Sequence, residues 1–282
     1  MAYGNEQFSF DITEIEITEE GKIYKGLKRG IISTNEGLKI NADNFLYNKV
    51  SNQLNASGNV IINDINKNLK IFADKITYYK NDEKIIGEKN LEIKINDILI
   101  TANKFEYQNL FNIISISENV IFNDKKEDLV IYADKITYFK NKNKFITDGP
   151  TEAKIKSRYN LKSKNLTFFD DKMLISSNDK TTVIDNGITS YQLDQFTYQI
   201  KNEFLKGINI YLNENIKVSK NETNQLFFKD GFFDLKNNRY IAGETKVILK
   251  KNIFNNTNND PRLKGAATKS NNGITTIEKS VF

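Results

Sequence analysis

A near-identical internal repeat is the feature that most limits how this chain can fold. The stretch IFADKITYYKN at residues 71–81 returns as IYADKITYFKN at residues 131–141, with nine of eleven positions identical and the other two exchanging one aromatic residue for another. Further copies, some weaker, lie at 38–49, 98–109, 160–171, 190–202 and 225–238. The alanine of each copy, or its equivalent, is at position 42, 73, 102, 133, 163 or 193, in steps of 31, 29, 31, 30 and 30. A period of this length predicts one supersecondary unit per repeat, stacked on its neighbours.

A second motif alternates with the first. LNASGNVIIND (54–64) and ISISENVIFND (114–124) are close relatives, and 87–97, 147–157, 178–187, 212–220 and 242–251 occupy the equivalent places. The segments of both motifs are short, rich in Ile, Val, Phe, Tyr and Thr, and bounded by Asn, Asp and Gly, which is typical of strands. The two prolines, Pro150 and Pro261, are expected outside strand interiors, and no stretch shows a helical stripe. We therefore predict an all-β fold with almost no helix.

The spacing of apolar residues in the first motif predicts a bend. Ile71, Ala73, Ile76 and Tyr78 are separated by two, three and two positions. A regular strand cannot place all four on one face, because a shift of one residue changes the face. A bulge or corner at the Asp-Lys step restores the phase and bends the strand. Asp74 and its counterpart Asp134 are expected to serve this corner, because Asp and Asn tolerate unusual backbone angles and satisfy nearby N–H groups.

Repeated corners predict a stacked, bent, double-layered β-structure. With each repeat adding one strand to a given sheet at ~4.8 Å, about seven repeats would extend over roughly 35 Å. Such an array, in which each repeat contacts only its neighbours, is elongated.

Composition narrows the class of protein further. The chain of 282 residues is long enough for one large domain or two ordinary ones, and 39% apolar residues suffice for a core. The net charge of +5 comes from intermixed Lys and Asp/Glu residues, so we expect no nucleic-acid partner. The absence of Cys leaves the redox compartment open. No apolar run approaches the ~18 residues of a membrane helix, and no secretory signal is visible at the start.

The alternation of an I-x-A-D/N-x-Φ-x-Y strand with an A-S-G-N-V-type strand resembles the OstA-like domains of the lipopolysaccharide transport proteins LptA, LptC and LptD. The resemblance extends from about Phe8 to Lys251. The segments 8–26 and 259–282 look most like the N-terminal periplasmic domain of LptD. On this basis we expect a tail at 1–7, an OstA-like domain at 8–254, and at 255–282 an Asn-rich linker with the start of a missing barrel region.

This resemblance implies an elongated open β-jellyroll, V-shaped or taco-like, whose apolar trough holds lipopolysaccharide or lipid A acyl chains and passes them to the outer membrane. It implies a location in the periplasm, associated with the outer membrane. It also implies edge-strand pairing with an LptA-like protein, and contact with an outer-membrane barrel and its plug lipoprotein where the full chain exists. It implies no cofactor. The lipid-binding inner face is then predicted to comprise Ile40, Ala42, Phe45, Tyr47, Ile71, Ala73, Ile76, Tyr78, Ile100, Ala102, Phe105, Tyr107, Ile131, Ala133, Ile136, Tyr138, Leu166, Phe168, Phe196 and Tyr198.

Other interpretations of the same residues remain open. Apolar residues on one face of a strand are usually ordinary core, so the chain could be a structural β-solenoid or adhesin segment with a closed interior. It could equally be a free-standing LptA-like bridge. The recurring tyrosines would suit the edge of a trough, because a buried tyrosine needs a partner for its hydroxyl.

An enzyme is not expected. The chain has no His and no Cys, so it contains neither a Ser-His-Asp nor a Cys-His arrangement and no zinc ligands of these types. It also lacks the glycine-rich phosphate-binding loops. Carboxylate chemistry would need two acids on one face, whereas Asp170 and Asp171 are adjacent and so point to opposite sides of a strand.

Overall fold

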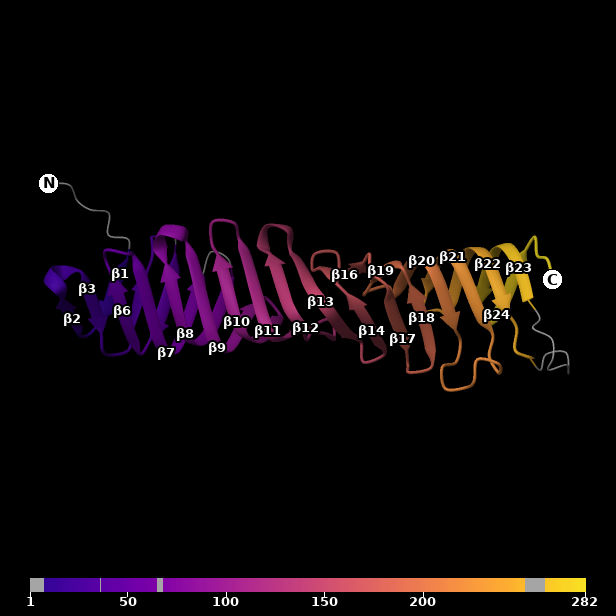
Figure 1. Ribbon diagram of the computed structural model, residues 1–282, viewed down its shortest axis with the longest axis horizontal. Helices are drawn as coiled ribbons and strands as arrows, with labels where there is room; N and C mark the ends of the chain where they lie inside the picture. The colour runs from indigo at the N-terminus through magenta and orange to yellow at the C-terminus, as the bar shows by residue number, and fades with distance from the viewer. Residues whose placement is uncertain (1–7, 36, 65–67, 252–261) are drawn as a thin grey trace. The chain divides into compact units, whose positions relative to one another are not determined.

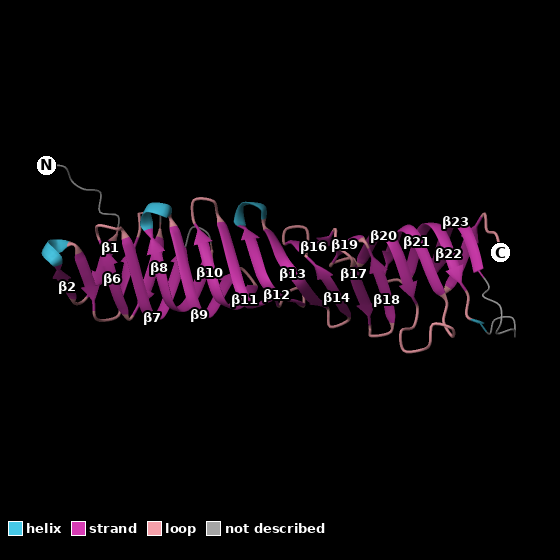
Figure 2. Cartoon of the chain, viewed as in Figure 1, coloured by secondary structure: helices cyan, strands magenta, loops and turns pink. Residues whose placement is uncertain are grey.

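The computed structural model describes residues 8–35, 37–64, 68–251 and 262–282. The chain divides into two compact units, which are described separately: residues 1–126 with 134–141 form unit 1, and residues 127–133 with 142–282 form unit 2. Among the described residues, helical structure is confined to single 3-10 turns such as η1 (Glu19–Gly21), η3 (Lys80–Asp82) and η4 (Lys140–Lys142), drawn in cyan in Figure 2. The prediction of an all-β jellyroll is confirmed.

Unit 1 is an antiparallel array in which successive strands are neighbours from β7 to β11 (Figure 1). The earlier strands are half as long and are paired as β1 with β4 and β2 with β3, followed by β4–β5 and β3–β6. The strands are β1 (Ser9–Ile12), β2 (Ile15–Thr18), β3 (Ile23–Gly26), β4 (Gly30–Ser33), β5 (Leu38–Ala42), β6 (Asn44–Asn48), β7 (Gln53–Asp64), β8 (Leu69–Tyr79), β9 (Lys84–Ile95), β10 (Ile98–Gln108) and β11 (Ile113–Asp124). The chain of β12 (Leu129–Phe139) is divided between the two units.

Unit 2 repeats this arrangement. β13 pairs with both β14 and β15, and β20 pairs with both β18 and β19, so two half-length strands together match one long strand. From β20 to β24 the strands again pair in chain order. The strands are β13 (Lys144–Ile155), β14 (Tyr159–Lys164), β15 (Thr167–Phe169), β16 (Leu174–Ser177), β17 (Thr181–Asp185), β18 (Thr189–Leu193), β19 (Gln195–Gln199), β20 (Phe204–Asn213), β21 (Gln225–Asp234), β22 (Arg239–Ile248), β23 (Arg262–Asn271) and β24 (Ile274–Glu278).

The predicted corner lies within the long strands β7 to β11 of unit 1. The pairing register shifts between Phe72 and Lys75 in β8 and between Thr101 and Lys104 in β10. Burial alternates up to Ala73, is interrupted at two exposed residues, and resumes at Ile76. The break in the sequence rhythm therefore correctly located the point at which the strand changes direction.

The corners fold each sheet back on itself. Asp64 at the end of β7 pairs with Leu69 at the start of β8, and Leu69 pairs with Ile95 at the end of β9. Ile95 pairs with Ile98 at the start of β10, so these four strand ends lie side by side. In a flat sheet Tyr107, nine residues further along β10, would lie roughly 30 Å from that end at ~3.4 Å per residue. Yet the Tyr107 hydroxyl donates a hydrogen bond of 3.2 Å to Asp64 Oδ2. The two ends of the strands therefore face each other across an interior, and we call the line of corners the crease.

One prediction about the stacking was wrong. Each period was expected to add one strand to a given sheet, whereas each period contributes two long strands, such as β7 and β8. Both strands cross the crease, since residues on either side of the register shift pair with the same neighbouring strand. Each period therefore adds two strands to each half of the sheet.

A recurring pair of side chains holds the crease. Asn59 and Asn90, from the second motif, have positive φ angles of 46° at the corner. Their side-chain amides each donate a 2.7 Å hydrogen bond to the corner carboxylate of the neighbouring strand, which is Asp43 for Asn59 and Asp74 for Asn90. The corner role predicted for Asp74 thus holds in part: the aspartate accepts a hydrogen bond, while the asparagine across from it adopts the unusual backbone angle.

The expectation that proline lies outside strand interiors was wrong for Pro150. This residue is inside β13, directly after Gly149, whose φ is +89°, and is paired with Lys164. The corner explains this placement, because a proline, which lacks an N–H, is tolerated in a sheet at a bulge. Pro261 lies outside the described residues.

The described part of the predicted linker contains strands. Residues 262–271 form β23, which is paired with β22, and residues 274–278 form β24. The tail at 1–7 and the stretch at 252–261 lie outside the described residues. The domain boundaries at 8–254 and 255–282 remain predictions.

Gly58 lies at the crease, where both its backbone angle and the space around it disfavour a side chain. Its φ of +78° is costly for any residue with a Cβ, and a Cβ there would lie 2.8 Å from Asp43 Oδ2. We expect Gly58→Ala to lower the free energy of unfolding by about 2 kcal/mol in a urea titration. Gly21 has a similar φ of +86° with open space around it, so Gly21→Ala should cost about 1 kcal/mol. Equal losses in the two variants would contradict the crowding at the crease.

Candidate functional site

The twenty predicted inner-face side chains all lie inside the jellyroll. Their exposed fractions range from 0% at Ile40 to 9% at Ala133. In β8 and β10 of unit 1, two of the four residues precede the crease and two follow it, so both halves of the sheet contribute to the apolar interior of this unit. The structure therefore buries all twenty side chains, and their assignment to one lipid-binding face remains a prediction. Their contact with lipid remains a prediction.

Tyrosines form one border of the interior in unit 1. The Tyr47 hydroxyl donates to Asn52 Oδ1 at 3.0 Å, and the Tyr78 hydroxyl donates to Glu83 Oε2 at 2.8 Å. The Tyr107 hydroxyl lies 2.9 Å from Asn109 Oδ1 and shares its single proton between this oxygen and Asp64 Oδ2. Each ring is buried while its hydroxyl is held by a polar residue of the following turn. We call these strand ends, with the turns at 49–52, 80–83 and 109–112, the tyrosine rim. The other ends of the same strands, where Asp64 and Ile98 lie, form the opposite rim.

The two rims of unit 1 are joined by side chains. Phe8, which precedes β1 at the opposite rim, packs edge-on against Tyr47 and Tyr78 with ring centroids 5.1 and 5.7 Å away. Further along, Asp64 of the opposite rim accepts the hydrogen bond of Tyr107 and lies 4.0 Å from Lys140 Nζ. The Lys140 and Asp64 side chains are 9% and 5% exposed, so this bridge is sheltered from water. We call this line of contact between the rims the seam.

The seam of unit 2 is centred on Glu203, which lies in the turn after β19 on the side equivalent to the tyrosine rim. Three residues of the opposite rim reach its carboxylate. The Tyr159 hydroxyl donates to Oε2 at 2.6 Å, Lys156 Nζ donates to Oε1 at 2.9 Å, and Arg158 Nη1 donates to Oε2 at 3.3 Å. Arg158 also forms a two-pronged ion pair with Asp185, at 2.7 and 2.8 Å. One buried carboxylate thus collects donors from the facing rim.

The charges at the seam are fixed at neutral pH. Burial alone raises the pKa of the Glu203 carboxyl, but the hydrogen bonds from Tyr159 and Lys156 outweigh it and bring the pKa below its usual value. Burial, followed by the adjoining carboxylate, raises the pKa of the hydroxyls of Tyr107 and Tyr159. Both tyrosines therefore remain neutral donors, and the hydrogen bond from Tyr159 to the Glu203 carboxylate is charge-assisted.

The seam residues were missed in the sequence, although one signal was present. In LNASGNVIIND the alternation places Val60, Ile62 and Asp64 on the same face, so Asp64 had to be inside. Asp124 ends the sister motif and is also buried. No comparable pattern marks Glu203, since its partners are 44 to 47 residues away in the chain.

No group of three or more His, Cys, Asp or Glu side chains in the described ranges is arranged to hold a metal ion. The same ranges contain no helix of the length and apolarity that crossing a membrane requires.

Residues 39–144 match the family described as "LptA/(LptD N-terminal domain) LPS transport protein". This segment is an OstA-like domain of the lipopolysaccharide transport family. It runs from β5 to the first residue of β13 and contains the four best copies of the repeat. The family consists of transport proteins rather than enzymes.

One solved structure also shows a weak similarity to this chain. The crystal structure of LptH, described as the LptA homologous periplasmic component of the conserved lipopolysaccharide transport device from Pseudomonas aeruginosa, is 8% identical. The match covers 61% of this chain and 81% of that chain, with a TM-score of 0.20. At that TM-score the fold rests on the strand pairings described above and not on the superposition. No curated protein matches the sequence.

Proposed function

We propose that this protein is a periplasmic lipopolysaccharide-binding module, similar to the N-terminal domain of LptD, that passes lipopolysaccharide along its interior to the outer membrane. The observation that supports this most directly is the position of the family match. Residues 39–144 include sixteen of the twenty inner-face residues, four from each of four copies of the repeat, from Ile40 to Tyr138. The matched segment is therefore the part of the chain with the most regular apolar interior.

The interior has the chemistry that acyl chains need. Each buried CH₂ of a chain gains ~0.8 kcal/mol on leaving water. The inner faces of β8, β10 and β12 present Ile, Ala and Tyr at matching positions, so a chain meets the same apolar surface in each period. A lipid can thus move along the repeat with little change in its free energy, as transport requires.

Loading would require the seam to part. Within each unit, the rims of the described residues are joined by side chains such as Asp64 and Glu203, whereas the backbone hydrogen bonds run along each half of the sheet. Separating the rims therefore breaks side-chain contacts and leaves the strand pairing intact. The apolar surface exposed in this way would be covered by the incoming acyl chains.

Edge strands offer docking sites for LptA-like neighbours. In unit 1, β1 pairs with β4 alone and β2 with β3 alone, and in unit 2, β24 pairs with β23 alone. A strand with one unpaired side is a template for a strand of another protein. We propose head-to-tail pairing at these edges. Contacts with an outer-membrane barrel and its plug lipoprotein are proposed on the family likeness to LptD.

Photo-crosslinking tests the proposal. A photoreactive residue at Phe105 or Tyr138, which are 1% and 5% exposed, should label lipopolysaccharide after incubation with the whole chain. The same probe at the exposed neighbour Lys104, or at Lys75, should give at most background labelling. The expected ratio between inner and outer positions is about tenfold or more, because the acyl chains would contact one face of each strand.

A structural β-solenoid with a closed core is the second candidate, favoured by the near-complete burial of the interior. In that case inner probes such as the one at Phe105 would remain unlabelled while the protein stays folded. Equal labelling from both faces would also contradict the transport proposal, since it would indicate nonspecific adsorption.

A further inference from the structure

Unit 2 contains a cavity at its seam, which we call the seam cavity. It has a volume of about 240 Å³. Asn238 lines it from the turn between β21 and β22, and Arg239 lines it from the start of β22. Thr189 and Glu214 line it from the facing rim. Both rims therefore contribute to its walls. The direct bridge of Glu203 lies next to it, because Arg158 belongs to both.

The floor of the seam cavity is the apolar core. Leu212 and Phe233 line it and are 4% and 1% exposed. The Tyr191 ring, 8% exposed, packs edge-on against Phe233 with centroids 5.3 Å apart. The cavity is therefore polar at the rims and apolar toward the interior, which is the pattern expected where an amphipathic molecule changes from head to tail.

The charged side chains around the cavity are largely satisfied by each other. Arg158 is held by Asp185, and Arg239 Nη2 donates to Asp234 Oδ2 at 2.9 Å. With Glu214 added, three carboxyl groups face two guanidinium groups. A free phosphate would meet no unmatched positive charge here. A neutral ligand that both donates and accepts hydrogen bonds fits this lining better.

Two polar side chains of the cavity, Tyr240 and Glu214, can form hydrogen bonds with such a ligand. The buried Tyr240 hydroxyl lies beside the hydroxyls of Ser270 and Thr275, which line the same cavity and are hydrogen-bonded to each other at 3.2 Å. Among the described residues, no hydrogen bond of standard geometry satisfies the Tyr240 hydroxyl itself. A buried polar atom left in this state costs free energy, so a site for a ligand or water atom is expected beside it. Burial also raises the pKa of the Glu214 carboxyl, even though Asn224 Nδ2 lies 3.5 Å from its Oε2. A hydroxyl group of a ligand could satisfy both side chains.

The volume limits the size of the ligand. At ~30 Å³ per water the cavity holds about eight waters. It is smaller than the roughly 300–1,000 Å³ of sites that enclose drug-sized molecules. One sugar ring fits these limits, whereas a whole lipid does not.

We propose that the seam cavity binds one sugar ring of a glycolipid headgroup, with Tyr240 and Glu214 bonding to its hydroxyls, while the acyl chains continue over Phe233 into the interior. This inference rests on the proposed lipid-carrying function and adds to it the place where the head of the lipid sits. The seam of unit 2 would then bind the sugar of the headgroup in addition to joining the two rims.

Binding measurements on the whole chain test the inference. Wild type, Tyr240→Phe and Glu214→Gln are titrated with lipopolysaccharide and, in parallel, with a single-chain phospholipid that has no sugar. Each substitution keeps the shape of its side chain and removes one hydrogen-bonding function. We expect each to weaken lipopolysaccharide binding about tenfold and to leave phospholipid binding unchanged. Tyr211→Phe is the matched control, since its hydroxyl is bound to Gln225 and lies outside the cavity.

The outcomes separate the inference from the function on which it rests. Equal effects on both lipids, or no effect on either, overturn the sugar site, while labelling from Phe105 would still support lipid transport. Absence of both binding and labelling in the wild type overturns both proposals. Thermal melts of the three variants that match the wild type show that any loss of binding is not a loss of fold.

Discussion

Replacing Glu203 by glutamine lowers the free energy of unfolding by about 3 kcal/mol at neutral pH. The carboxylate is 11% exposed and accepts hydrogen bonds from Tyr159, Lys156 and Arg158. Glutamine keeps the shape of the side chain but removes its negative charge, so Lys156 and Arg158 lose an ionic partner at a site that is largely shielded from water. Because the pKa of Glu203 in the folded protein lies below its ordinary value of 4.5, this contribution is fully present above that pH. It is lost as the pH falls through the folded-state pKa.

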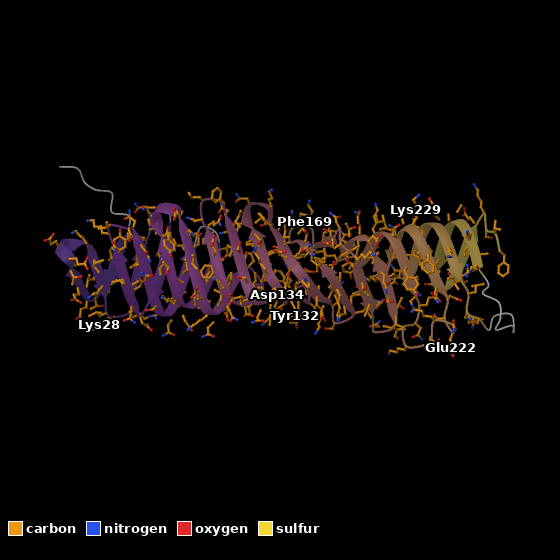
Figure 3. The ribbon with its side chains drawn as sticks, in the orientation of Figure 1. Lys28, Tyr132, Asp134, Phe169, Glu222 and Lys229 are labelled. Atoms are coloured by element: carbon orange, nitrogen blue, oxygen red, sulfur yellow. The ribbon has the colours of Figure 1, made fainter. Side chains whose placement is uncertain are left out.

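The measurement is urea unfolding of both proteins at neutral pH and at successively lower pH. The gap between wild type and variant should close in acid, where both side chains are neutral. Glu244→Gln is the matched control, since Glu244 is also paired with a lysine, Lys229, but their side chains are 67% and 62% exposed (Figure 3 labels Lys229). Water and salt screen such a pair, so little change is expected. A Glu203 variant no less stable than this control would disprove the bridge.

Replacing Gly87 by alanine lowers the free energy of unfolding by about 3 kcal/mol. Gly87 in β9 is opposite Phe105 in β10, and a Cβ on the glycine would overlap the aromatic ring at Cε1. The ring is 1% exposed and cannot turn aside without disturbing the interior. The loss should be visible as a lower urea midpoint with an unchanged slope.

A second substitution identifies the cause. In the double variant Gly87→Ala with Phe105→Leu, the smaller side chain makes room, so the combined loss should be at least ~1 kcal/mol smaller than the sum of the two single losses. Gly243→Ala is the control, because its nearest neighbour, Asp230 Oδ1, is 3.3 Å away at the end of a flexible side chain. If the two single losses simply add in the double variant, the cost of Gly87→Ala comes from the backbone conformation and not from a clash with the Phe105 ring.

The sequence was sufficient to predict the layers of this fold but not its closure. Periodicity is a local property, so the step from Ala73 to Ile76 located the crease, and the residues predicted from the same spacing are buried. The number of strands per period was predicted wrongly, because the same apolar pattern is compatible with a strand that ends at the corner or one that continues through it.

The seam could not be predicted for a different reason. Which residues meet across the two rims depends on the angle at which the folded sheet closes, and each bridge joins residues far apart in the chain. Tyr107 and Asp64 are 43 positions apart, and Tyr159 and Glu203 are 44 apart. Each tyrosine signalled that a partner was needed for its hydroxyl. The sequence did not say that the partner would lie on the facing rim.

The hydrogen-bonded pair at each corner makes the length of the domain adjustable. Asp43 and Asn59 are 16 positions apart, and so are Asp74 and Asn90. Removal of one whole period between β8 and β11 would bring Asp74 opposite Asn119, an asparagine that, like Asn90, has a positive φ (57° and 46°). The new neighbours would meet in register, with tyrosine still at one border and aspartate at the other. Evolution can therefore lengthen or shorten such a repeat domain by about 10 Å per period without redesigning the rest.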